Sequence, residues 1–148
     1  MAVLIDTDLL IDLEKGDDAV EGLLGDQERA ISVITVSELL HGVLRAQGAT
    51  RARRQAFVEH LLAGLQAIPI TQPVARIHAD IWAGLADRGE QVGAHDLWIA
   101  ATAIAHGLAI ATRNNTHFNR IPGLRVITAP ACAILDPVGR VTSDTLPQ

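Results

Sequence analysis

Residues 3–13, VLIDTDLLIDL, change their hydrophobic pattern after the third position. The first three side chains are a continuous apolar run, which is typical of a strand buried on both faces. Asp6 ends this run, and the leucines at positions 9, 10 and 13 have the spacing of one helix face. The stretch therefore predicts a strand, a turn and a helix, with Asp6 at the carboxyl end of the strand.

The same alternation of strand and helix patterns continues along the chain. Strands that alternate with helices favour an α/β fold, in which a parallel sheet is covered by helices on both faces. The further predicted strands are residues 30–34, 67–70, 108–111 and 125–127, and the further predicted helices are residues 20–24, 36–48, 57–65, 74–85 and 97–105.

Length and composition indicate one globular domain. The chain has 148 residues, of which 49% are apolar and 20% are charged, and this fits a single soluble core. The longest mainly apolar run, residues 97–105, is shorter than the roughly 20 residues that cross a bilayer. The N-terminus has no pattern of a secretory signal, so we expect a cytoplasmic protein without a membrane segment.

The single cysteine and the C-terminal segment carry no recognisable chemistry. Cys132 can neither form an internal disulfide nor complete a structural zinc site, so we expect a small core residue there. The hydrophobic pattern weakens after Pro130, and residues 131–148 are predicted to be a poorly packed tail without an assigned role.

The formal net charge of −5 excludes a basic protein that coats nucleic acid along its whole surface. Any contact with nucleic acid has to be local. Arginines gather at two places, around the link between two predicted helices and after the fourth predicted strand, and each group is either solvated surface or a patch that attracts phosphates. The first group is Arg45, Arg51, Arg53 and Arg54, and the second is Arg113, Arg120 and Arg125.

Acidic residues follow the predicted strands at the edge where ligands bind in open parallel sheets. Asp6 ends the first strand, Glu38 opens the helix after the second, and Asp96 opens the helix before the fourth. After the fourth strand, residues 112–118, TRNNTHF, offer oxygen and nitrogen ligands but no carboxylate. A convergence of acids is costly without a divalent cation, and hard cations such as Mg²⁺ or Mn²⁺ prefer oxygen ligands.

Two of these acids also have a purely structural interpretation. Asp96 has the position of a helix N-cap, and Thr35 with Glu38 forms a T-x-x-E capping box. Glu38 lies opposite the apolar stripe of its own helix, which leaves it free to approach a cleft. Asp6 is different, because a lone carboxylate after a central strand is costly unless it is paired or bound to metal.

Other chemistries lack support in the sequence. The histidines show no zinc-binding spacing, and His78, on an apolar helix face, is expected in the core, whereas His117 has a plausible site position. No serine-hydrolase elbow, Walker loop or dinucleotide fingerprint is present. Asp6-Thr7-Asp8 resembles the opening of haloacid-dehalogenase-type phosphatases, but the only lysine, Lys15, comes too early to hold a phosphate.

Four motifs in order resemble PIN-domain ribonucleases, specifically the VapC toxins of bacterial toxin–antitoxin pairs: LIDTDLLID, ISVITVSELLHG, GAHDLWIAATA and IATRNNTHFNRIPGLRV. The similarity covers residues 1 to about 128, and we assign residues 1–130 to the PIN domain. The resemblance implies a three-layer α/β/α sandwich with a mainly parallel five-stranded sheet. It also implies endonucleolytic cleavage of RNA with Mg²⁺ or Mn²⁺, inhibition of translation or growth, a homodimer, and neutralisation by a VapB-like antitoxin.

The resemblance also assigns roles residue by residue. Asp6, Glu38 and Asp96 match the three acidic catalytic positions, with Asp6 and Asp96 as the expected metal ligands. Thr112 matches the threonine or serine that supports the site in this family. Many relatives have an acid at a fourth position, where this chain offers Asn114 and His117 as supporting residues, and the missing charge should weaken metal affinity. The alternative is a non-catalytic module that binds the antitoxin through a degenerate acidic site.

Overall fold

A five-stranded sheet forms the centre of the computed structural model, which describes residues 2–128. The strands are β1 (Ala2–Ile5), β2 (Glu28–Ser32), β3 (Gln66–Ile68), β4 (Ala109–Thr112) and β5 (Val126–Thr128). Their order is β3-β2-β1-β4-β5, and every neighbouring pair is parallel. The expected five-stranded parallel sheet is confirmed, and β1 is its central strand.

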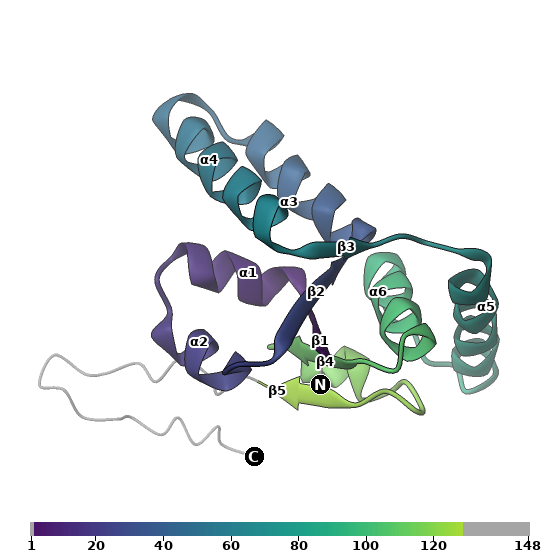
Figure 1. Cartoon of the computed structure of the whole chain (residues 1–148). Coiled ribbons are helices and arrows are strands. Elements are labelled where there is room, and N and C mark those ends of the chain that lie inside the picture. Colours follow the sequence, from purple (N-terminus) through teal and green to yellow (C-terminus); the bar gives the residue numbers. More distant parts are fainter. Residues whose placement is uncertain (1, 129–148) are drawn as a thin grey trace, which may run out of the picture.

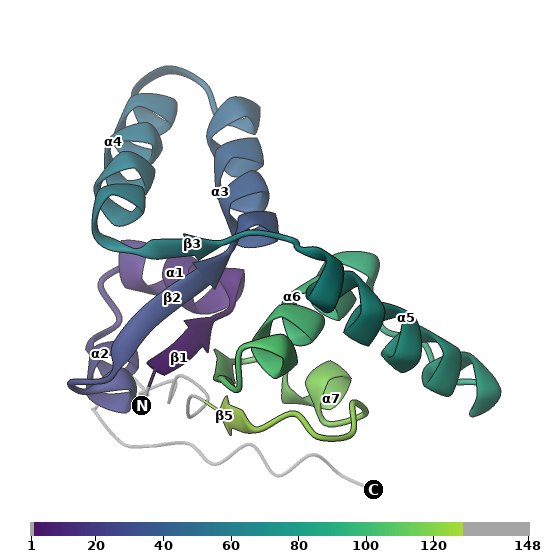
Figure 2. The ribbon, with the colours of Figure 1, turned by 45° about the vertical axis from the view of Figure 1, so that its right-hand side comes forward.

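Helices cover the sheet on both faces, which confirms the three layers (Figures 1 and 2). On one side lie the helices from the first half of the chain, and on the other lie those from the second half. The first group is α1 (Thr7–Glu14), α2 (Asp18–Leu24), α3 (Val33–Arg45) and α4 (Gly48–Gly64), and the second is α5 (Gln72–Asp87), α6 (Ala94–Ala105) and α7 (Asn115–Phe118).

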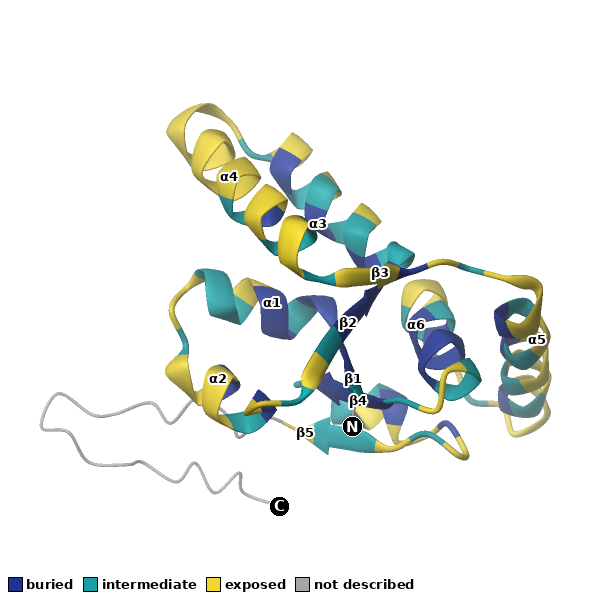
Figure 3. Ribbon diagram, in the orientation of Figure 1, coloured by how far each residue is buried: buried dark blue, intermediate teal, exposed yellow. Residues whose placement is uncertain are grey.

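The central strand contributes to both hydrophobic clusters. Val3 and Ile5 pack with residues of α1 to α4, whereas Leu4 packs on the opposite face with residues of α6 and α7. All three residues are 0–1% exposed, and Figure 3 shows β1 and the second half of β2 in the colour of buried residues. A strand buried on both faces needs apolar residues at successive positions, as its sequence predicts.

The boundary between β2 and α3 differs from the prediction. The β-branched run at residues 30–34 predicts a strand, but the strand ends at Ser32 and the helix begins at Val33. Ser32 Oγ accepts a hydrogen bond from the backbone amide of Ile34 at 3.1 Å. A serine N-cap stabilises the start of a helix, and this local contact outweighs the strand propensity of the residues after it.

The segment that carries the first arginine group is helical. Residues 48–56 precede the predicted helix 57–65, but α4 extends over both, and only two residues link it to α3. The interpretation of this segment as a link between helices was therefore wrong. The short helix α7 was not predicted, and β4 and β5 each begin one residue later than predicted.

Within residues 2–128, none of the helices combines the length and hydropathy required to span a membrane. Cys132 and the predicted tail of residues 131–148 lie outside the described residues.

A matched pair of leucines tests the packing of the α1 layer. Leu10 is 1% exposed on α1, whereas Leu44 is 65% exposed on α3. We expect Leu10→Ala to lower the free energy of unfolding by about 2–5 kcal/mol, because it leaves a cavity. Leu44→Ala should change it by about 0.5 kcal/mol or less. Urea denaturation of both variants measures this, and equal losses would contradict the described packing.

Candidate active site

Asp6 lies at the carboxyl end of the central strand and begins the helix that follows. Its side chain is 6% exposed. Asp6 Oδ1 accepts a hydrogen bond from the backbone amide of Thr7, and Oδ2 accepts one from Thr112 Oγ1, both at 2.8 Å. Thr112 is the last residue of β4, which pairs with β1. The parallel pairing therefore brings two residues together that are 106 positions apart in sequence.

Thr7 connects Asp6 to Glu38 on α3. Thr7 Oγ1 donates to Glu38 Oε1 at 2.9 Å and lies 3.2 Å from Thr35 Oγ1. A capping box requires Thr35 to be the N-cap of α3. The N-cap is Ser32, and Thr35 is a fully buried residue within the helix, so the capping-box interpretation of Thr35 and Glu38 was wrong. No role for Thr7 was predicted from the sequence, although a hydroxyl next to Asp6 at a strand end was a signal for one.

Asp96 lies in the first turn of α6, three residues after its N-cap Gly93. The N-cap interpretation of Asp96 was therefore also wrong. Asp96 Oδ2 lies 3.2 Å from His117 Nδ1, which in turn lies 2.9 Å from Asn114 Nδ2. When Nδ1 is protonated it donates to Asp96, and when it is bare it accepts from the amide of Asn114. Of the two fourth-position candidates, His117 is the one in contact with Asp96.

Negative charge accumulates around Asp6. Burial, together with the charges of Asp8 and Asp96, raises the pKa of Asp6 from 3.8 to about 7, although the hydrogen bonds from Thr112 and Thr7 lower it. Burial also raises the pKa of Asp8, whose Oδ1 has no hydrogen-bond partner within residues 2–128. Among the described residues, no basic side chain is recorded in a hydrogen bond with Asp6, and the positive charge of Arg113 acts instead on Asp8, whose pKa it lowers.

The donor set fits a hard cation. Carboxylates of Asp6 and Asp96 and the amide of Asn114 are oxygen donors of the kind that Mg²⁺ and Mn²⁺ prefer. Among the described residues, no group of three or more His, Cys, Asp or Glu side chains is arranged to enclose a metal ion. Mg²⁺ usually keeps several waters and takes one or two carboxylates from a protein.

Arg113 holds together the elements that surround the site, a role that the sequence analysis missed. Its backbone amide donates to Asp8 Oδ2 at 3.2 Å, and its guanidinium bonds to Asp12 on α1 and to Asp17, the N-cap of α2. The acids between positions 8 and 17 were the available signal, but nothing in the sequence indicated which arginine pairs with them.

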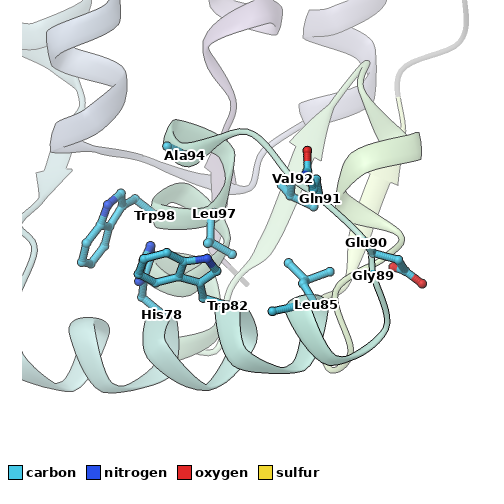
Figure 4. Close-up of a pocket in the computed structure, with 11 residues that line it drawn as sticks. His78, Trp82, Leu85, Gly89, Glu90, Gln91, Val92, Ala94, Leu97 and Trp98 are labelled. Atoms are coloured by element: carbon cyan, nitrogen blue, oxygen red, sulfur yellow. The ribbon is translucent and has the colours of Figure 1, made fainter.

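A cavity of about 580 Å³ lies between α5 and α6 (Figure 4), and none of these acids lines it. His78 lines it and stacks on Trp98, with ring centroids 3.6 Å apart. Burial lowers the pKa of His78. His78 is 9% exposed, so its predicted place in the core is confirmed. The cavity contains none of the predicted catalytic residues.

Comparisons with known proteins agree on one family. Residues 3–124 match the model of the PIN domain. Ribonuclease VapC of Rickettsia bellii (strain RML369-C) is 33% identical over 131 residues, which cover 88% of this chain and 98% of the relative. Ribonuclease VapC1 of Rickettsia felis is 35% identical over 129 residues, 86% of this chain and 96% of the relative. In the structure of DNA-bound VapBC from Salmonella typhimurium, one chain superimposes with a TM-score of 0.77 at 30% identity and covers 85% of this chain and 96% of its own length.

The raised pKa of Asp6 predicts a pH-dependent stability of the metal-free protein. A carboxyl with a higher pKa in the folded state makes folding less favourable as the pH rises from about 4 to about 7. Asp6→Asn removes this effect, so we expect the variant to be more stable than the parent at pH 8 by at most a few kcal/mol, since one pKa unit equals about 1.4 kcal/mol. The difference should vanish near pH 4.

Thermal denaturation in EDTA across this pH range measures the effect. Asp80→Asn is the control, because Asp80 is an exposed acid on α5. A difference between parent and Asp6→Asn that does not change with pH would contradict the burial of this charge.

Proposed function

The chain belongs to the VapC ribonucleases of the PIN-domain family, and we propose that it cleaves RNA with the help of a divalent metal ion. In this role it is the toxin of a toxin–antitoxin pair. The observation that carries the metal proposal is the buried carboxylate of Asp6, which the negative charges of Asp8 and Asp96 surround and which has no basic partner among residues 2–128.

The residues have distinct roles in this proposal. Asp6 and Asp96 hold the ion. Thr112 fixes the orientation of Asp6 by donating to Oδ2, and the Thr7 amide fixes Oδ1. Glu38, whose Oε1 accepts from Thr7 and whose Oε2 lies 3.6 Å from His95 Nδ1, would orient the attacking water. When bound, a divalent ion lowers the pKa of water and stabilises the charge that develops on the phosphate.

A VapB-like antitoxin is the partner that the family indicates, since the related structures are toxin–antitoxin complexes. The homodimer stays a prediction, and the molar mass in solution measures it. The alternative function, a non-catalytic module that only binds the antitoxin, has one feature in its favour. Many relatives carry an acid at the fourth position, where this chain offers Asn114 and His117, and this would leave the site with one negative charge fewer.

The first functional prediction is metal-dependent cleavage that requires Asp96. The purified chain, freed of antitoxin, should cleave a structured RNA in Mg²⁺ or Mn²⁺ and stop in EDTA. Asp96→Asn should lower the rate by at least about a hundredfold, because changing even a residue that only orients a metal ligand costs 10- to 100-fold. The fold should persist, since Gly93 and not Asp96 caps the helix.

Asp87→Asn, an exposed acid on α5, is the control and should retain full activity. Gel electrophoresis of end-labelled RNA measures the rates, and thermal melting reports the fold. Cleavage that persists in EDTA, or an Asp96→Asn variant as active as the parent, would contradict the metal mechanism.

The second functional prediction concerns the fourth position. His117→Asp places a carboxylate beside Asp96, which lies 3.2 Å from the present imidazole. An added anionic ligand strengthens the binding of a hard cation, so we expect the dissociation constant for Mn²⁺ to be roughly ten- to hundredfold lower than in the parent. Catalysis need not improve, because tighter binding in the ground state does not stabilise the transition state.

Thr116→Asp is the matched control, because it adds the same charge at an exposed position of the same short helix. Calorimetric titration of Mn²⁺ into both variants and the parent measures the affinities. Equal affinities in the three proteins would place residue 117 out of reach of the ion.

A further inference from the structure

Positive charge is concentrated in one stretch of this acidic chain. Residues 39–58 contain four arginines and no acidic residue. Because the whole chain carries −5 and this stretch carries +4, the remaining residues carry −9. We name Arg45, Arg51, Arg53 and Arg54 the hairpin arginines, after the helical hairpin that α3 and α4 form. Their concentration distinguishes this surface from the rest of the molecule.

The hairpin extends away from the sheet and exposes these side chains. Figures 1 and 2 show α3 and α4 side by side, rising from one edge of the fold. All four hairpin arginines are exposed, and Val58 is the only buried residue of α4 (Figure 3). This charge is therefore accessible to a large ligand.

The hairpin arginines have few partners, unlike several arginines elsewhere. Arg29 is bonded to Glu21, and Arg120 is bonded to the carbonyl of Gln91. Among the hairpin arginines, the one ion pair recorded within residues 2–128 joins Arg54 to Glu14 at 3.9 Å, a long contact between partly exposed groups that contributes little stability. The cluster is therefore not explained by internal charge pairing.

The hairpin begins at the candidate active site. Glu38 lies in the first half of α3, where it accepts from Thr7. Arg45 follows seven residues later, and two helical turns return it to nearly the same face, roughly 10 Å further along the axis. His41, between them on this face, is also exposed. A ligand that enters the site at Glu38 and continues along α3 therefore reaches Arg45.

We propose that the hairpin arginines bind backbone phosphates of the RNA substrate outside the scissile bond. The inference rests on the proposed ribonuclease function and extends it to a second contact surface. Guanidinium groups match phosphates in geometry and charge. Contacts to phosphate position a nucleic acid without reading its sequence. The hairpin thus supplies affinity and orientation, and bond cleavage occurs at the acids.

Charge-neutralising variants test this contact. Arg51→Gln, Arg53→Gln and Arg54→Gln are combined in one protein, Arg45→Gln is made separately, and Arg76→Gln on α5 is the control with an exposed arginine. We expect the triple variant to raise the KM for RNA roughly tenfold at low salt and to leave kcat unchanged. The slope of log(kcat/KM) against log salt should fall by about 2, since each single-strand phosphate contact contributes about 0.7.

A binding measurement separates this inference from the proposed function. In the Asp96→Asn background and in EDTA, the anisotropy of a labelled RNA reports binding without cleavage. Weaker binding of the triple variant supports the contact even if the parent fails to cleave. A parent that cleaves, with unchanged KM, salt slope and RNA affinity in the variants, overturns the inference and leaves the proposed function intact.

The same proteins also distinguish an antitoxin contact from an RNA contact. Loss of co-purification with the antitoxin, together with unchanged RNA binding, would assign the hairpin arginines to the protein partner and overturn the inference. Thermal melting of each variant checks the fold, which these exposed side chains should not affect.

Discussion

The burial of the Asp6 carboxylate at the end of the central strand is the constraint on which the site depends. A buried charge is costly unless hydrogen bonds or a cation compensate it. The fold supplies only the hydrogen bonds, from the Thr7 amide and the Thr112 hydroxyl. The nearby charges of Asp8 and Asp96 oppose ionisation, so the pKa rises to about 7. A divalent cation would neutralise the negative charge that the fold leaves uncompensated around Asp6. Strongly shifted pKa values of this kind are common at functional sites.

Periodicity along the sequence was sufficient to predict the layers but not the local contacts between them. The apolar run at residues 3–5 and the acid after it correctly placed Asp6 at the centre of a parallel sheet. The same reasoning extended β2 too far, because the hydrogen bond from the Ile34 amide to Ser32 is a single local contact that propensity does not reveal. It also missed the helical character of residues 48–56, which contain no large apolar side chain to mark a helix face.

The contacts that orient the side chains of the site could not be predicted from the sequence, for a different physical reason. Arg113 and Asp12 are 101 positions apart, and only the closure of the sheet brings them together. Thr7 reaches Glu38 across 31 positions in the same way. Sequence spacing can place an acid at the end of a strand, but it cannot say which hydroxyl or guanidinium will face it. The types of residue at the site were thus predictable, whereas their partners were not.

An acidic pocket and a polyanionic substrate repel each other. The distribution of charge along this chain reduces that repulsion. The residues outside the hairpin stretch 39–58 carry a net −9, which includes every acid of the candidate site. A divalent cation neutralises charge only over the short range of its ligands, since exposed charges are screened within about 10 Å in ordinary salt. A backbone that extends further from the scissile bond still meets the acidic body. Arg45, one of the exposed hairpin arginines, follows Glu38 by two helical turns and so lies near that limit. Concentrating them on a projecting hairpin therefore allows RNA to approach while the pocket keeps the carboxylates that its chemistry requires.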